Sequence, residues 1–155
     1  MFYGKGITKA NAQSIPGIKR LQAENPDITI VAGYQAYCRA KITKKVIILN
    51  TALNKKLLIS IALHELGHIR THNENLFIIS REKLAWKFAR KYAKDHNYQY
   101  NDEEEKESLA VYLDGYKESR KFLRERNRLM PTPIKITEEL FQEYYTMCLR
   151  RSFSY

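Results

Sequence analysis

The sequence has few of the residues that cross-link a chain or anchor it in a membrane. Its two cysteines, Cys38 and Cys148, stand far apart among 155 residues, so the pattern indicates neither a disulfide framework nor a CxxC metal motif. No apolar run approaches the roughly 18–20 residues that a membrane span requires. The first residues, MFYGKGITKA, lack the apolar segment of a secretory signal. We therefore expect a cytoplasmic protein without a membrane span.

Glycine (6 residues) and proline (4 residues) are also scarce, and no Gly/Ser linker or proline-rich tract divides the chain. The length matches one domain, since domains usually hold about 100–200 residues. We expect a single domain over residues 1–155. It would comprise an N-terminal helix and strands (1–53), a central helical segment (54–96) and C-terminal helices of unassigned role (97–155).

Basic residues outnumber acidic residues in this sequence. Lysine and arginine number 27 against 17 aspartates and glutamates, which gives a net charge of +10. Such a balance favours a polyanionic neighbour, nucleic acid above all. The basic residues are spread along the chain rather than clustered, and this is equally typical of solvated helix faces. Direct nucleic-acid binding therefore has weak support.

The N-terminal third predicts one helix and then strands. Residues Ser14 to Glu24 favour a short helix with Pro16 in its first turn, where a missing N–H does no harm. Short runs rich in β-branched and aromatic residues follow, and such runs favour strands. They are Ile28–Val31, Tyr34–Ala40 and Val46–Leu49.

From residue 54 the apolar spacing changes to three and four, which predicts helices. We expect one from Asn54 to His72, and one from an N-cap at Ser80 to His96. An acidic start after Asn101 suits the N-terminus of a third helix, and Thr137 caps a last one after a break at residues 130–133. The predicted class is α+β, with a small sheet followed by helices.

Residues 64–68 read His-Glu-Leu-Gly-His, an HExxH motif on a predicted helix. Residues four apart on a helix differ by about 40° and about 6 Å along the axis, so His64 and His68 can bind one ion. Zn²⁺ binds neutral imidazole and keeps one position open for water in catalytic sites. Glu65 lies about 100° around the helix, from where it can act on that water as general base and pass the proton to a leaving amine.

A third ligand is needed. His72 is eight residues past His64, about 12 Å along the axis, so an unbroken helix cannot bring it to the same ion. His72 and His96 each fit better at a helix C-terminus, where the dipole favours them when protonated.

Two glutamates are candidates for that ligand. Glu82 follows His68 by 14 residues, in the first turn of the next helix, and a connection of this length lets that helix fold back. The result would be a His-His-Glu zinc site. Glu107 also begins an apolar helical stripe, and it stays open as the alternative.

Two further features bear on the site. Gly67 costs about 1 kcal/mol relative to alanine inside a helix, which indicates a close approach there, by a packed helix or by substrate. Tyrosines on the predicted helical stripes could stabilise a developing oxyanion, but the pattern selects none of them. These tyrosines are Tyr112, Tyr116, Tyr144 and Tyr145.

His-Glu-Leu-Gly-His, a further histidine at 72 and the sequence Glu82-x-x-Ala85-x-x-Phe88-Ala89 resemble the ImmA/IrrE family of metallopeptidases. The family belongs to the gluzincins, in which a glutamate on the helix after HExxH is the third zinc ligand. The resemblance covers residues 46–89. It implies a zinc metallopeptidase with ligands His64, His68 and Glu82 and with Glu65 as catalytic acid and base.

The resemblance also implies a partner and a substrate path. Members are typical of bacteria, phages and integrative elements, and ImmA-type members cleave the DNA-binding repressor of their own element. Residues 46–50 resemble the family's edge strand, along which an extended substrate can pair. A different class of function also fits the charge, namely a zinc-stabilised, non-proteolytic regulator that binds DNA or protein.

Overall fold

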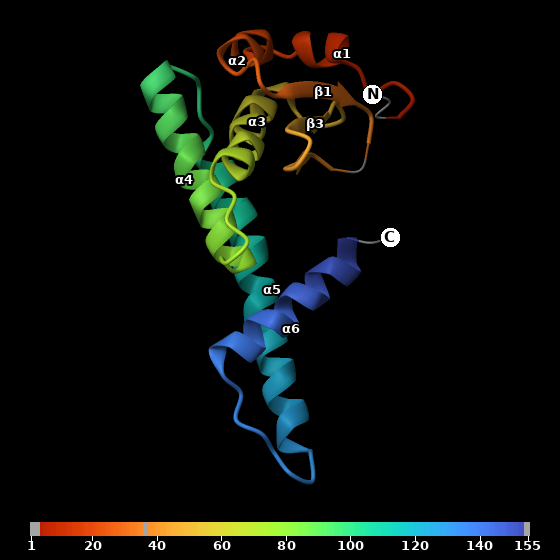
Figure 1. Ribbon diagram of the computed structural model, residues 1–155, viewed down its shortest axis with the longest axis vertical. Helices are drawn as coiled ribbons and strands as arrows, with labels where there is room; N and C mark the ends of the chain where they lie inside the picture. The colour runs from red at the N-terminus through yellow and green to blue at the C-terminus, as the bar shows by residue number, and fades with distance from the viewer. Residues whose placement is uncertain (1–3, 36, 154–155) are drawn as a thin grey trace.

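The computed structural model of the protein describes residues 4–35 and 37–153, with side chains as far as Thr146. It confirms the α+β class, with a three-stranded sheet at one end and helices extending from it (Figure 1). The elements follow in the order α1 (Lys9–Gln13), α2 (Ile18–Glu24), β1 (Thr29–Gly33), β2 (Arg39–Lys41), β3 (Val46–Asn50), α3 (Lys55–Arg70), α4 (Ile78–His96), α5 (Asp102–Arg128) and α6 (Glu138–Phe153).

The strand order is β1-β3-β2. β3 pairs in parallel with β1, Thr29 opposite Val46, and antiparallel with β2, Arg39 opposite Ile48. The expectation that residues 46–50 form an edge strand is therefore wrong, because β3 has a neighbour on both sides. All five of its residues are buried. The edge strand beside α3 is β2, which is shorter than the predicted Tyr34–Ala40 strand.

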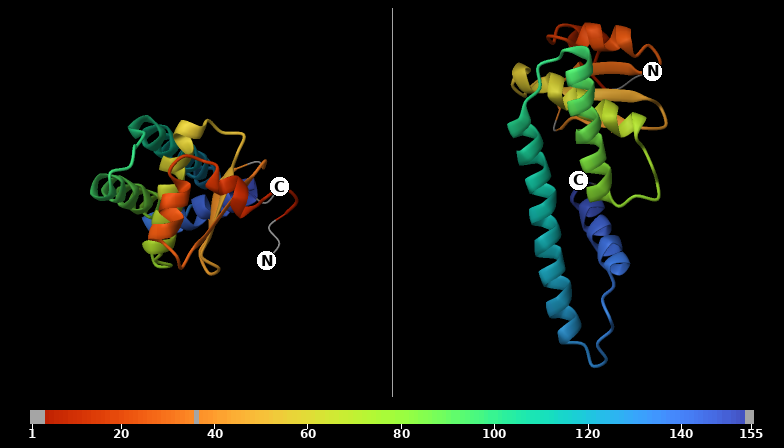
Figure 2. Two further views of the ribbon diagram at one scale, coloured as in Figure 1. Left: turned by 90° about the horizontal axis from the view of Figure 1, so that it is seen from above. Right: turned by 90° about the vertical axis from the view of Figure 1, so that its left-hand side faces the viewer.

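The main core lies on one face of the sheet. Ile47 and Leu49 of β3 point to this face, and side chains of α1, α2 and α3 pack there with them. Because strand side chains alternate, Ile48 points to the opposite face, where Ile7 packs on a smaller cluster. Helix α3 is thus buried between the sheet and α4. Helices α3 and α4 pack against each other (Figures 1 and 2).

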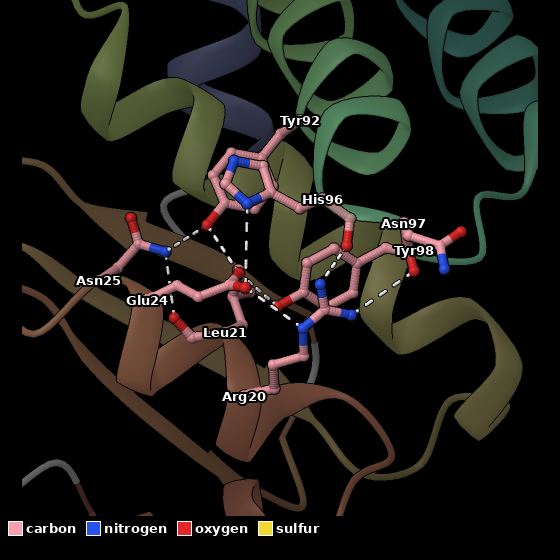
Figure 3. A network of polar contacts seen from close by, with 8 residues as sticks. All are labelled: Arg20, Leu21, Glu24, Asn25, Tyr92, His96, Asn97 and Tyr98. Carbon is pink, nitrogen blue, oxygen red and sulfur yellow. Dashed lines mark hydrogen bonds and ion pairs between the residues drawn. The ribbon is translucent and has the colours of Figure 1, made fainter.

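A polar network fastens α2 to the C-terminal end of α4 (Figure 3). The Glu24 carboxylate accepts hydrogen bonds from the hydroxyls of Tyr92 (2.9 Å) and Tyr98 (2.6 Å) and from Arg20 Nε (3.2 Å). Arg20 also donates to the carbonyl oxygen of His96. His96 ends α4 as predicted, and its ring stacks on Tyr92. The network fixes α4 at the end far from its first turn.

Two helix boundaries differ from prediction. The expected Ser14–Glu24 helix is wrong in its first turns: α1 ends at Gln13, and α2 begins only after Gly17, whose φ of 86° breaks the helix. Pro16 lies in this break. Helix α4 begins at Ile78 with Phe77 as N-cap, so Ser80 is already inside the helix.

The other predicted helix starts are confirmed, and at each of them the structure shows an N-cap. The side chains of Asn54, Asn101 and Thr137 accept hydrogen bonds from the backbone N–H groups two or three residues on. Each satisfies an N–H that has no partner in the first helical turn. These starts were predictable because capping involves only neighbours in sequence.

Helix α5 leaves the sheet end of the molecule and α6 folds back against it (Figure 2). Tyr145 of α6 donates a 2.6 Å hydrogen bond to the carbonyl oxygen of Tyr112 on α5. No helix among the described residues is both long enough and apolar enough to cross a membrane. The predicted place of Cys148 on the apolar stripe of the last helix concerns a side chain outside the described residues.

Candidate metal centre

Three predicted side chains converge between α3 and α4. His64 Nε2 and His68 Nε2 lie 3.0 Å apart. Glu82 on α4 places one carboxylate oxygen 3.1 Å from His64 Nε2 and the other 3.0 Å from His68 Nε2. These three residues are close enough to hold a metal ion.

The donor set fits zinc. Ligand atoms about 2.0–2.1 Å from a tetrahedral ion lie about 3.3 Å from one another, close to the three distances at this site. Two imidazole nitrogens and a carboxylate are also a donor set that catalytic zinc uses. His64 and Glu82 are more than nine-tenths buried, so a charged cluster here requires compensation within the protein.

The position of Glu82 follows from a close contact between the two helices. A Cβ atom on Gly67 would lie 2.5 Å from the carbonyl oxygen of Ala85 and 2.9 Å from its Cα. The missing side chain lets the α4 backbone approach α3 one turn after Glu82. The sequence left open whether a packed helix or a substrate approaches Gly67, and the structure shows a packed helix.

Trp86 holds the ring of His64 in place. The two rings stack with centroids 4.1 Å apart and planes inclined by 23°, and Trp86 is fully buried. His64 Nδ1 is buried with no hydrogen-bond partner among the described residues. Stacking, rather than an outer hydrogen bond of the usual kind, therefore orients His64 with Nε2 toward the other ligands.

Glu65 lies beside the three ligands, on the side of β2. Burial raises the pKa of its carboxyl, and nearby His64 and His68 offset part of that rise. The backbone of Ala40 on β2 lowers the pKa slightly as well. Glu65 is therefore a stronger base than an exposed glutamate, and it lines one cleft with Ala40 of the edge strand.

The pKa of the Glu82 carboxyl is lowered overall, although burial by itself would raise it. Desolvation raises the pKa of Glu82, while hydrogen bonds from His64 and His68 lower it to about 2. The same carboxylate raises the pKa of His68 against the lowering effect of burial. Glu82 is thus ionised, as a metal ligand must be.

The remaining candidates lie outside this group. Glu107 is exposed on α5 and is not part of the cluster. His72 follows the end of α3 and lines the cleft without joining the three ligands. His96 belongs to the network at the far end of α4.

The site opens into a cleft of about 530 Å³ that sequence reasoning did not outline. Its walls include Arg39 and Ala40 of β2, Arg81 of α4 and Tyr112 of α5. Tyr112 stood among the tyrosines predicted as possible oxyanion partners, and its place on an apolar stripe was the available signal. Tyr112 lines the cleft together with Glu65 and Glu82, and its pKa is raised by burial and by these two carboxylates. No pattern in the sequence indicated that Arg39 and Arg81 would line this cleft.

No match was found between this chain and a known protein family, a curated protein or a solved structure. The resemblance to the ImmA/IrrE family therefore rests on the motif residues alone.

Proposed function

We propose that this protein is a zinc metallopeptidase that hydrolyses a peptide bond in a protein substrate. The observation that carries the proposal is the convergence of His64, His68 and Glu82 within 3.1 Å, with Glu65 buried beside them. This arrangement joins a ligand set for zinc to a base at the open side of the site. A purely structural zinc site has four protein ligands and no need of the base.

His64, His68 and Glu82 would hold the ion. When bound, zinc supplies Lewis acidity toward a water molecule and the scissile carbonyl group. The Glu65 carboxylate then accepts the proton of the attacking water and returns it to the nitrogen of the leaving amine. Burial raises the pKa of Glu65, which makes its carboxylate a better proton acceptor than an exposed one. The hydroxyl of Tyr112 is a donor for the negative charge that develops on the carbonyl oxygen.

The substrate would lie extended along β2. This strand pairs with β3 on one side and has no strand on its other side among residues 4–35 and 37–153. Ala40 of β2 and Glu65 of α3 line the same cleft, so a segment added along this edge passes the base and the metal site. Addition of a strand to a sheet edge supplies backbone hydrogen bonds for such a segment.

The biological target that the motif resemblance favours is the DNA-binding repressor of a phage or mobile element, cleaved in the cytoplasm. The net charge of +10 is compatible with action near DNA. Cleavage would then release the genes that the repressor controls.

Zinc-loaded wild type and Glu65→Gln, incubated with a pool of proteome-derived peptides, test the proposal by mass spectrometry of the new peptide ends. We expect cleavage by wild type and a fall of at least about a hundredfold in the variant, at equal zinc content. Glu107→Gln, an exposed change of the same kind, serves as control. Equal cleavage by the Glu65 variant would refute the mechanism.

A wild type that binds zinc but cuts no peptide would favour the non-proteolytic regulator. A salt-sensitive gel shift with duplex DNA would support that function, because phosphate contacts release counterions.

A further inference from the structure

Two arginines line the cleft without a carboxylate partner. Arg39 comes from β2 and Arg81 from the first turns of α4. Neither takes part in an ion pair within the described part of the chain, although ten such pairs are found there. Charges of this kind are normally neutralised when they face a partly enclosed site.

The cleft's own acids are already engaged. Glu82 contacts both histidines, and Glu65 lies near the same two histidines, whose charge lowers its pKa. Arg81 donates to two neutral acceptors, the carbonyl oxygens of Asn73 (3.2 Å) and Glu74 (2.9 Å). These bonds fix the guanidinium without cancelling its charge. The positive charge of the wall is therefore left for an incoming group.

Arg39 is the less satisfied of the two. Its Nε is buried and has no hydrogen-bond partner among the described residues. An arginine cannot lose its proton to relieve this situation, and a buried donor without a partner is costly. A carboxylate satisfies a guanidinium with two parallel hydrogen bonds. Arg39 directly precedes Ala40 on β2, and both residues line the cleft together with Glu65, so Arg39 lies beside the path along β2.

We propose that Arg39, assisted by the charge of Arg81, forms a subsite for an acidic side chain of the bound segment. That the bound segment is a peptide rests on the proposed function. The preferred substrate then carries Asp or Glu at a fixed distance from the cleaved bond. The recognition itself needs the arginine and the cleft, not the hydrolysis.

Cleavage-site profiling tests the preference. Wild type, Arg39→Gln and Arg39→Glu are loaded with zinc and given the proteome-derived peptide pool. We expect Asp and Glu enriched at one position in wild type, no enrichment in Arg39→Gln, and Lys or Arg enriched in Arg39→Glu. Lys41→Gln removes the same charge two residues along β2 but not from the cleft wall, and it should keep the wild-type preference. Acidic enrichment that persists in Arg39→Gln would overturn the proposal.

A binding measurement separates this subsite from the chemistry. Fluorescent decapeptide pools, identical except for a central Glu, Gln or Lys, are titrated by polarisation into metal-free wild type and into zinc-loaded Glu65→Gln. We expect the Glu pool to bind about ten- to a hundredfold more tightly than the Gln pool, as for a charge-assisted pair, with the difference lost in Arg39→Gln.

The two failures are distinguishable. Binding preference without cleavage would refute the peptidase and retain the acidic subsite. Cleavage with equal binding of the Glu and Gln pools, or no binding of any pool, would refute the subsite. Tight binding of a labelled single-stranded DNA that depends on Arg39, in place of the peptides, would assign the arginine to phosphate and also overturn the proposal.

Discussion

Gly67 of α3 packs directly on the backbone of Ala85 of α4: a Cβ on the glycine would stand 2.5 Å from the alanine's carbonyl oxygen. One turn before Ala85 on α4 is Glu82, and one turn before Gly67 on α3 is His64. The spacing of the two backbones at this contact therefore sets the distance between the carboxylate and the imidazoles. A structural contact outside the ligand set controls the geometry of the metal site.

Gly67→Ala should separate the helices and weaken metal binding. Alanine gains about 1 kcal/mol in helix propensity, but the overpacking that it introduces costs about 1–3 kcal/mol, because the atoms that it meets are backbone. We expect a weaker zinc affinity by competition with a chelator. Gly115→Ala is the matched control, since there a Cβ meets the Tyr145 hydroxyl at 3.4 Å. Unchanged zinc affinity in Gly67→Ala would show that the contact does not set the site.

Glu82→Ala and His64→Ala should each remove zinc from the purified protein, while Glu107→Ala should retain it. Glu82 and His64 belong to the group of three residues that could hold the ion, whereas Glu107 is exposed on α5. Metal content by mass spectrometry, with zinc supplied during purification, gives the answer. One zinc per chain in Glu82→Ala would transfer the third-ligand role to another residue.

Tyr112→Phe should lower peptide hydrolysis by about tenfold to a thousandfold without loss of zinc, because one donor to the developing oxyanion disappears. The kinetics should show a fall in kcat with little change in KM. Tyr116→Phe, one turn further along α5, removes a hydroxyl that binds Glu138 and should leave hydrolysis intact. If the two variants behave alike, Tyr112 has no role beyond packing.

Glu24→Gln should destabilise the protein in a pH-dependent manner. Burial raises the pKa of Glu24, but hydrogen bonds from Tyr98 and Tyr92 and the charge of Arg20 lower it overall. A lowered pKa contributes stability above the ordinary glutamate pKa of about 4.3, and this contribution is lost as the pH falls through and below it.

We therefore expect the free energy of unfolding of Glu24→Gln, measured with denaturant, to be about 1–2 kcal/mol below that of wild type at pH 7. This difference should shrink as the pH falls below about 4.5. Glu103 is exposed and pairs with Lys106, so Glu103→Gln should show almost no loss of stability. A deficit that is constant with pH would mean that Glu24 acts by packing rather than by charge.

The sequence by itself determined the local features. The helix starts at Asn54, Asn101 and Thr137 were predictable because a cap bonds to an N–H only two or three residues away. His64 and His68 were predictable as a pair because helical geometry alone brings residues four apart onto one face. The predicted N-cap Ser80 is wrong, because α4 begins earlier, with Phe77 as its N-cap. Arg81 in the first turns of this helix donates to the carbonyl oxygen of Asn73 in the preceding loop.

Only the tertiary structure decided what depends on distant segments. Hydropathy marks 46–50 as a buried strand but not as the central one, because strand order depends on which segments return to pair with it. The spacing in sequence left both Glu82 and Glu107 open, and the contact between Gly67 and Ala85 brings only Glu82 to the histidines. Arg39 acquires its place in the cleft from pairing between β2 and β3. Packing between elements, which no local pattern encodes, converts a two-histidine motif into a complete site.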